Sequence, residues 1–116
     1  MIYRYALSYL ETWKKNPMRK PLILRGARQV GKTTLVENFA TEFDCFLKLN
    51  LDEEEDRLLF TRYKEIHRLI EAIFFHLQKN PTEGSTLLFI DEIQNSPEAV
   101  AILRYFHEKR PDIYVI

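Results

Sequence analysis

The residues of this chain that could do chemistry gather in two short stretches, residues 26–34 and the pair Asp91 and Glu92. The first stretch, "GARQVGKTT", fits the pattern G-x-x-x-x-G-K-[ST] at every fixed position. A random chain of this length would match that pattern roughly a few times in a thousand. Two of the three glycines lie within six residues here. Because glycine costs backbone entropy on folding, their placement indicates a local need for them.

The residue types of the first stretch suit the binding of phosphate groups. Gly26 lets the chain leave a strand in a tight turn, and Gly31 lets the backbone approach a phosphate closely. Successive backbone N–H groups can form an anion-binding nest, and the helix that follows adds its positive dipole end. Lys32 can reach the β- and γ-phosphates, and the Thr33 hydroxyl can bind Mg²⁺. The alternative interpretation is a tight strand-to-helix turn without a ligand.

The second stretch places two carboxylates after an apolar run. Residues 87–90 are all apolar, which is typical of a strand buried on both faces. Ligands of open α/β sheets bind beyond the carboxyl ends of the strands. We therefore expect Asp91 to face Mg²⁺ through a water molecule, and Glu92 to orient a water that attacks the γ-phosphate. The alternative is two exposed acids that cap a turn. Gln94 and Asn95 come next and could bond a phosphate or Glu92, or form a plain turn.

Hydrophobic patterns predict the elements that position these residues. An amphipathic helix is expected over residues 2–16, since Pro17 follows. Strands are expected at residues 22–25, 45–51, 86–91 and 112–116. Further helices are expected after the glycine loop, from the acidic residues 52–56 to about Phe60, from Ile66 to near Asn80, and from Ser96 onward. This alternation predicts an α/β fold with a parallel sheet and helices on both faces.

Apolar side chains at helical spacing predict which helix faces are buried. The expected stripes are Ile2, Ala6, Tyr9, Leu10 and Trp13; Leu35, Val36, Phe39 and Phe43; Ile66, Leu69, Ile70, Ile73, Phe74 and Leu77; and Val100, Leu103 and Phe106. Phe75 falls off its stripe, as a residue that contacts a partner would. Cys45 is expected to be a small core residue at the start of a strand.

Length and composition are those of one globular domain. The chain has 116 residues, 46% of them hydrophobic and 29% charged, with no apolar run long enough to span a membrane and no secretion signal. A single cysteine cannot form an internal disulfide and fits a reducing compartment such as the cytoplasm. The three histidines, His67, His76 and His107, lack the spacing of metal ligands.

Charge is distributed unevenly although the formal net charge is zero. Residues 1–34 contain eight basic residues against Glu11 alone, whereas residues 52–56 are all acidic. A basic N-terminal third could attract nucleic acid, in which case binding would weaken steeply with salt. A solvated helix face next to a phosphate loop accounts for the same residues.

The segments "RGARQVGKTTL" and "LFIDEIQ" together resemble the AAA+ superfamily of P-loop NTPases. They are most similar to the prokaryotic AAA-type ATPases with an R-G-x-R-Q-x-G-K-T loop and a D-E-I-Q motif. The resemblance implies a three-layer sandwich around a parallel sheet of order 5-1-4-3-2. It also implies ATP hydrolysis with Mg²⁺, with Lys32 and Glu92 as catalytic residues and Thr33 and Asp91 at the metal. The triphosphate-binding residues implied are Gly26, Ala27, Arg28, Gln29, Val30, Gly31, Lys32, Thr33 and Thr34.

Members of that superfamily continue past the fourth strand with a sensor residue, a fifth strand, an arginine that acts across a subunit boundary, and a helical lid. The resemblance therefore implies that residues 1–116 are a partial ATP-binding domain with its core at 21–116, which binds ATP but by itself hydrolyses it very slowly or not at all. It also implies a homo-oligomer or a C-terminal domain as partner, and a strand at 22–25 on the sheet edge would invite pairing. The alternatives are a nucleotide-binding module that does not hydrolyse, and a small-molecule kinase, against which Glu92 counts.

Overall fold

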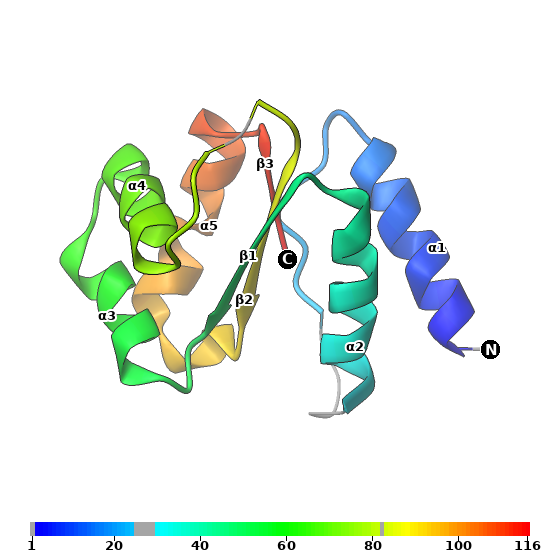
Figure 1. Cartoon of the computed structure of the whole chain (residues 1–116), viewed down its shortest axis with the longest axis horizontal. Helices are drawn as coiled ribbons and strands as arrows, with labels where there is room; N and C mark the ends of the chain where they lie inside the picture. The colour runs from blue at the N-terminus through cyan, green and yellow to red at the C-terminus, as the bar shows by residue number, and fades with distance from the viewer. Residues whose placement is uncertain (1, 25–29, 82) are drawn as a thin grey trace.

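A computed structural model describes residues 2–24, 30–81 and 83–116, and it shows three layers (Figure 1). The central layer is a parallel sheet of β1 (Cys45–Asn50), β2 (Thr86–Asp91) and β3 (Ile113–Val115), in the order β1-β2-β3. One face is covered by α1 (Ile2–Lys15) and α2 (Val30–Phe39), and the other by α3 (Glu54–Arg62), α4 (Ile66–His76) and α5 (Pro97–Lys109). Short 3₁₀ helices, η1 (Ala40–Glu42) and η2 (Ile93–Asn95), follow α2 and β2. The predicted α/β class is confirmed.

The central strand β2 separates two hydrophobic cores. Leu87 and Phe89 pack with α1 and α2, whereas Leu88 and Ile90 pack with the three helices of the other face. All residues of β2 except Asp91 are buried, as predicted for a strand covered on both sides. Because the strand is held on both faces, the position of Asp91 at its carboxyl end is fixed by packing.

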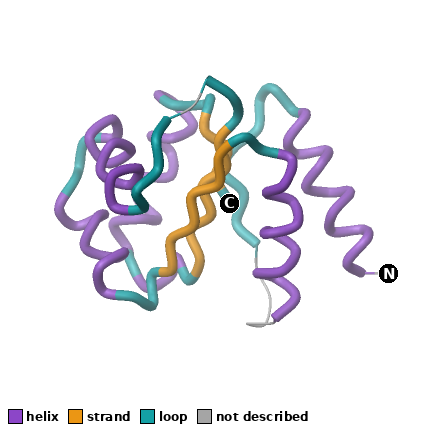
Figure 2. The backbone as a smooth tube through the Cα atoms, viewed as in Figure 1, coloured by secondary structure: helices purple, strands orange, loops and turns teal. Residues whose placement is uncertain are grey.

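The predicted strand at residues 22–25 is wrong for its described part, residues 22–24. This segment lies beside β3, where the Leu22 N–H donates to the Val115 carbonyl at 3.0 Å (Figure 2). A single backbone hydrogen bond does not form the ladder of a paired strand. Pro21 has no N–H to donate, and β3 is only three residues long. The segment therefore takes the expected place in the strand order without forming a strand. Arg25 lies outside the described residues.

The predicted buried stripe of α5 is partly wrong. Val100 is 45% exposed and Leu103 is only partly buried, whereas Ala99, Ile102 and Phe106 are buried against the other helices of that layer. The pattern was correct in its spacing, but packing against α3 and α4 selects the neighbouring stripe. In the predicted stripe of α1, Leu10 is buried as expected, whereas Tyr9 is 60% exposed.

Helix α4 ends at His76, earlier than the predicted end near residue 80. Gln78 adopts a left-handed conformation with φ of 57°. The N–H of Lys79 then donates to the Phe74 carbonyl at 2.9 Å, which closes the last turn as in a Schellman motif. The bounds of α1, α3, β1 and β3 differ from prediction by one or two residues.

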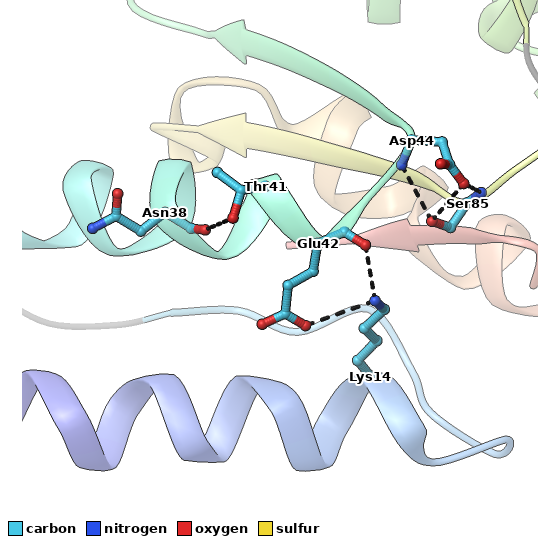
Figure 3. Close-up of polar contacts among 6 residues, drawn as sticks. All are labelled: Lys14, Asn38, Thr41, Glu42, Asp44 and Ser85. Atoms are coloured by element: carbon cyan, nitrogen blue, oxygen red, sulfur yellow. Dashed lines mark hydrogen bonds and ion pairs between the residues drawn. The ribbon is translucent and has the colours of Figure 1, made fainter.

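Polar contacts hold the ends of the elements opposite the candidate site (Figure 3). Lys14 Nζ on α1 donates to the Glu42 carbonyl at 3.1 Å and lies 3.7 Å from the Glu42 carboxylate. Asp44 Oδ2 accepts a bond from the Ser85 N–H at 2.8 Å, which joins the starts of β1 and β2. A Cβ atom at Gly84 would overlap the Asp44 side chain. This glycine therefore has a packing reason.

Candidate functional site

The structure brings the two predicted motifs together at the carboxyl edge of the sheet. Lys32 Nζ, on the first turn of α2, lies 3.4 Å from Asp91 Oδ1 at the end of β2. The two side chains are 22% and 13% exposed, so the pair is largely shielded and its attraction is stronger than that of a surface pair. The ammonium group and the carboxylate therefore face the same small region.

Only part of the predicted phosphate loop is described. Gly26, Ala27, Arg28 and Gln29 lie outside the described residues, and Val30 begins α2. Lys32 and Thr33 are partly buried, and Thr34 is exposed. The first N–H groups of a helix have no partner within the helix itself, so the start of α2 offers donors to groups outside the helix and a positive dipole end.

Among the residues that the structure describes, none packs so closely against Gly31 that a glycine is needed there. It lies in the first turn of α2, a conformation that any residue adopts, and a Cβ placed on it would meet no described atom within 4 Å outside its chain neighbours and its own helix. Glycine in a helix costs roughly 0.5–1 kcal/mol relative to alanine. Open space on this side of the helix start is what a closely approaching phosphate requires.

Glu92 follows β2 in an unusual backbone conformation. Its φ and ψ are 56° and 44°, in the left-handed region, which costs a non-glycine residue roughly 1–2 kcal/mol. Its N–H donates to Asp91 Oδ1 at 3.0 Å, so the same carboxylate oxygen faces Lys32 and the backbone of Glu92. Strained backbone of this kind is concentrated at functional sites.

The side-chain amides of Gln94 and Asn95 have different hydrogen-bond partners. Gln94 Nε2 donates to Glu92 Oε1 at 2.6 Å, which is one of the alternatives expected from the sequence. Asn95 Nδ2 donates to Asp52 Oδ1 at 2.7 Å and to the Leu51 carbonyl at 3.3 Å. The turn after β2 is thereby fastened to the chain that leaves β1.

A cavity of about 370 Å³ adjoins these groups. Lys32, Glu92 and Gln94 contribute its polar lining, and residues 22–24 together with parts of β3 and α5 contribute most of the apolar lining. Lys32 and Glu92 are therefore accessible from one shared space, whereas Thr33 and Asp91 do not line it.

The donor set fits Mg²⁺ held mainly by water and phosphate oxygens. Thr33 and Asp91 offer a hydroxyl and a carboxylate, and Mg²⁺ in such sites uses one or two protein ligands. Within residues 2–24, 30–81 and 83–116, no three side chains of His, Cys, Asp or Glu gather as a metal site. His76 Nε2 lies 2.7 Å from Asp56 Oδ1.

Besides Lys32, two of the eight basic residues of the N-terminal third make side-chain contacts within the described part of the protein. Lys14 lies over the Phe43 ring at 4.5 Å as well as beside Glu42. Arg19 lies over the Tyr114 ring at 3.4 Å and donates to the Pro111 carbonyl. These contacts favour the structural interpretation of that charge over a nucleic-acid surface.

Lys32 in the first turn of a helix, beside an aspartate at the end of the central strand of a parallel sheet, is an arrangement consistent with a P-loop-type nucleotide-binding domain. A family profile described as "AAA domain" matches residues 18–116, and the chain belongs to that family. The domain is thus ATPase-like and of the nucleotide-binding type. No curated protein and no solved structure matched the chain. None of the helices in the described part is long and apolar enough to cross a bilayer.

Proposed function

We propose that this domain binds ATP with Mg²⁺ and directs a water molecule at the γ-phosphate. The observation that carries the proposal is the 3.4 Å approach of Lys32 Nζ to Asp91 Oδ1 at the carboxyl end of β2. This contact places a cation suited to phosphate beside a carboxylate suited to Mg²⁺, at the start of α2. Membership of the AAA domain family supports a nucleotide as the ligand.

Each residue of the site has a distinct proposed role. Backbone N–H groups of residues 26–34 bind phosphate oxygens, and Lys32 neutralises charge on the β- and γ-phosphates. The Thr33 hydroxyl and the Asp91 carboxylate hold Mg²⁺, which supplies further charge neutralisation when bound. Glu92 orients the attacking water and accepts its proton.

The test is single-turnover release of γ-phosphate, compared between the wild-type chain and Glu92→Gln. This assay reports the chemical step separately from product release. Loss of a general base lowers the rate roughly 10²- to 10⁴-fold, while ATP affinity should stay within about twofold. Equal, low rates in both proteins with retained ATP binding would instead support the non-hydrolysing module.

A further inference from the structure

We infer that Gln94 is a positioning residue for Glu92, whose carboxylate it holds in a fixed orientation for work on the attacking water. The inference rests on the proposed role of Glu92. The 2.6 Å bond from Gln94 Nε2 to Glu92 Oε1 is the contact that indicates it. An ionised carboxylate only accepts hydrogen bonds, so the amide group must be the donor. Bonds to a charged acceptor are shorter and stronger than neutral ones.

The backbone after β2 is shaped to allow this contact. Side chains two residues apart on a regular helix do not face each other. Here Glu92 is left-handed, with φ of 56°, and the Asn95 N–H donates to the Glu92 carbonyl at 3.1 Å to close the turn. This conformation places the Gln94 side chain beside that of Glu92. The strain at Glu92 is thus linked to the contact it makes.

The turn that carries Gln94 is itself anchored. Asn95 donates to Asp52 at 2.7 Å, and the Asp52 N–H donates to Asn50 Oδ1 at 3.0 Å. Asn50 is the last residue of β1 and lies opposite Asp91 in the sheet register. Gln94 therefore acts from a support that is fixed to two strand ends. A base oriented by a third group on a fixed support is the arrangement that general-base catalysis requires.

The two carboxylate oxygens of Glu92 can serve different partners, which is consistent with this role. Gln94 occupies Oε1 of Glu92 and leaves Oε2 available for a water molecule. Both side chains line the same cavity as Lys32. A Gln94 that only stabilised the turn would affect folding, whereas an orienting Gln94 affects the chemical step at unchanged ATP affinity.

The experiment compares γ-phosphate release and ATP affinity in the full chain and in Gln94→Ala, Gln94→Glu and Glu92→Gln/Gln94→Ala. Gln94→Glu keeps the size of the side chain and removes the donor. We expect both Gln94 single variants to release phosphate roughly 10- to 100-fold more slowly, with ATP affinity within about twofold. The double variant should be no slower than Glu92→Gln alone, because the two residues act as one unit. Gln78→Ala, a Gln-to-Ala change two residues after the end of α4, should match the wild type.

An independent readout is the Gln94 side-chain amide in ¹H–¹⁵N spectra, which should shift in Glu92→Ala and stay in place in Gln78→Ala. A Gln94→Ala rate equal to or above that of the wild type, or an amide signal that Glu92→Ala leaves unchanged, would overturn the inference. If the proposed function itself fails, the wild-type chain shows no Glu92-dependent hydrolysis. That result also removes the positioning role, and the comparison of wild type with Glu92→Gln shows it without any Gln94 variant. If only the inference about Gln94 fails, Glu92→Gln is slow and Gln94→Ala is not.

Discussion

The Lys32 ammonium group lies 3.4 Å from the Asp91 carboxylate, which joins the first turn of α2 to the end of the central strand. If Asp91 holds Mg²⁺, Asp91→Asn should lower ATP affinity measured with Mg²⁺ at least tenfold, about 1.4 kcal/mol. Affinity without Mg²⁺ should not fall, because Lys32 loses a competing partner. Titrations with and without Mg²⁺ measure both values. An undiminished Mg²⁺ effect in Asp91→Asn would contradict the assignment.

A substitution of Gly31 should change the stability of the fold and the affinity for ATP in opposite directions. Because a Cβ there meets no atom of the described residues within 4 Å outside its own helix and chain neighbours, Gly31→Ala should raise the free energy of unfolding by roughly 0.5–1 kcal/mol. The same methyl group would occupy the space of a bound phosphate, so ATP affinity should fall at least tenfold. Urea denaturation and nucleotide titration test the two halves. A variant that is more stable and binds ATP normally would show that the open space is not a phosphate site.

Gln78 provides a test of the fold alone. Its φ of 57° at the end of α4 suits glycine, so Gln78→Gly should stabilise the protein by roughly 1 kcal/mol. Gln78→Ala keeps the strain and serves as the matched control. Thermal and urea unfolding measure the difference. Equal stability of the two variants would mean that the left-handed conformation does not limit the stability of this helix end.

Glu65 gives a prediction for pH. Its carboxylate caps α4 by accepting from the N–H groups of His67 at 2.9 Å and Arg68 at 3.1 Å. The His67 bond makes the largest contribution and lowers the pKa of Glu65 below its ordinary value; burial opposes it, and the Arg68 bond lowers the pKa further. Between the folded and the unfolded pKa of Glu65, the unfolded chain therefore binds more protons than the folded chain. The contribution of the cap to stability is complete above the unfolded pKa of about 4.3, and it is lost as the pH falls through the folded pKa.

Glu65→Gln measures this contribution directly. The stability difference between wild type and Glu65→Gln should be largest near neutral pH and should shrink as the pH falls below about 4. Denaturation curves at several pH values test it. A difference that stays constant down to acidic pH would show that the ionised form of Glu65 contributes nothing to the cap.

Strong, repeated patterns made most of the fold predictable. The continuous apolar run of β2 and the helical stripe of α4 both led to correct elements, because each pattern is satisfied by one arrangement. The segment at residues 22–24 was mispredicted because pairing depends on how many donors and acceptors its neighbour offers. The stripe of α5 was mispredicted because two adjacent stripes are apolar, and only contacts with α3 and α4 decide between them.

The residues of the candidate site could be predicted from the sequence, but the hydrogen bonds and the backbone conformation that hold them in place could not. Motif spacing was sufficient to expect Lys32 and Asp91 at one sheet edge, since strand ends and the following helix starts meet there. The bond from Asn95 to Asp52 joins residues distant in the sequence, and no local pattern indicates it. The left-handed Glu92 was likewise hidden, because glutamate carries no signal for that conformation.

The central claim is tested most directly by calorimetric titration of ATP into the folded wild-type chain and into Lys32→Ala, with Mg²⁺ present. We predict one ATP bound per wild-type chain and a loss of roughly 10- to 100-fold in affinity for Lys32→Ala, the value of a hydrogen bond to a charged group. Circular dichroism of both proteins serves as the control for folding. Absence of binding by a folded wild-type chain, or equal affinity of the two proteins, would contradict the account.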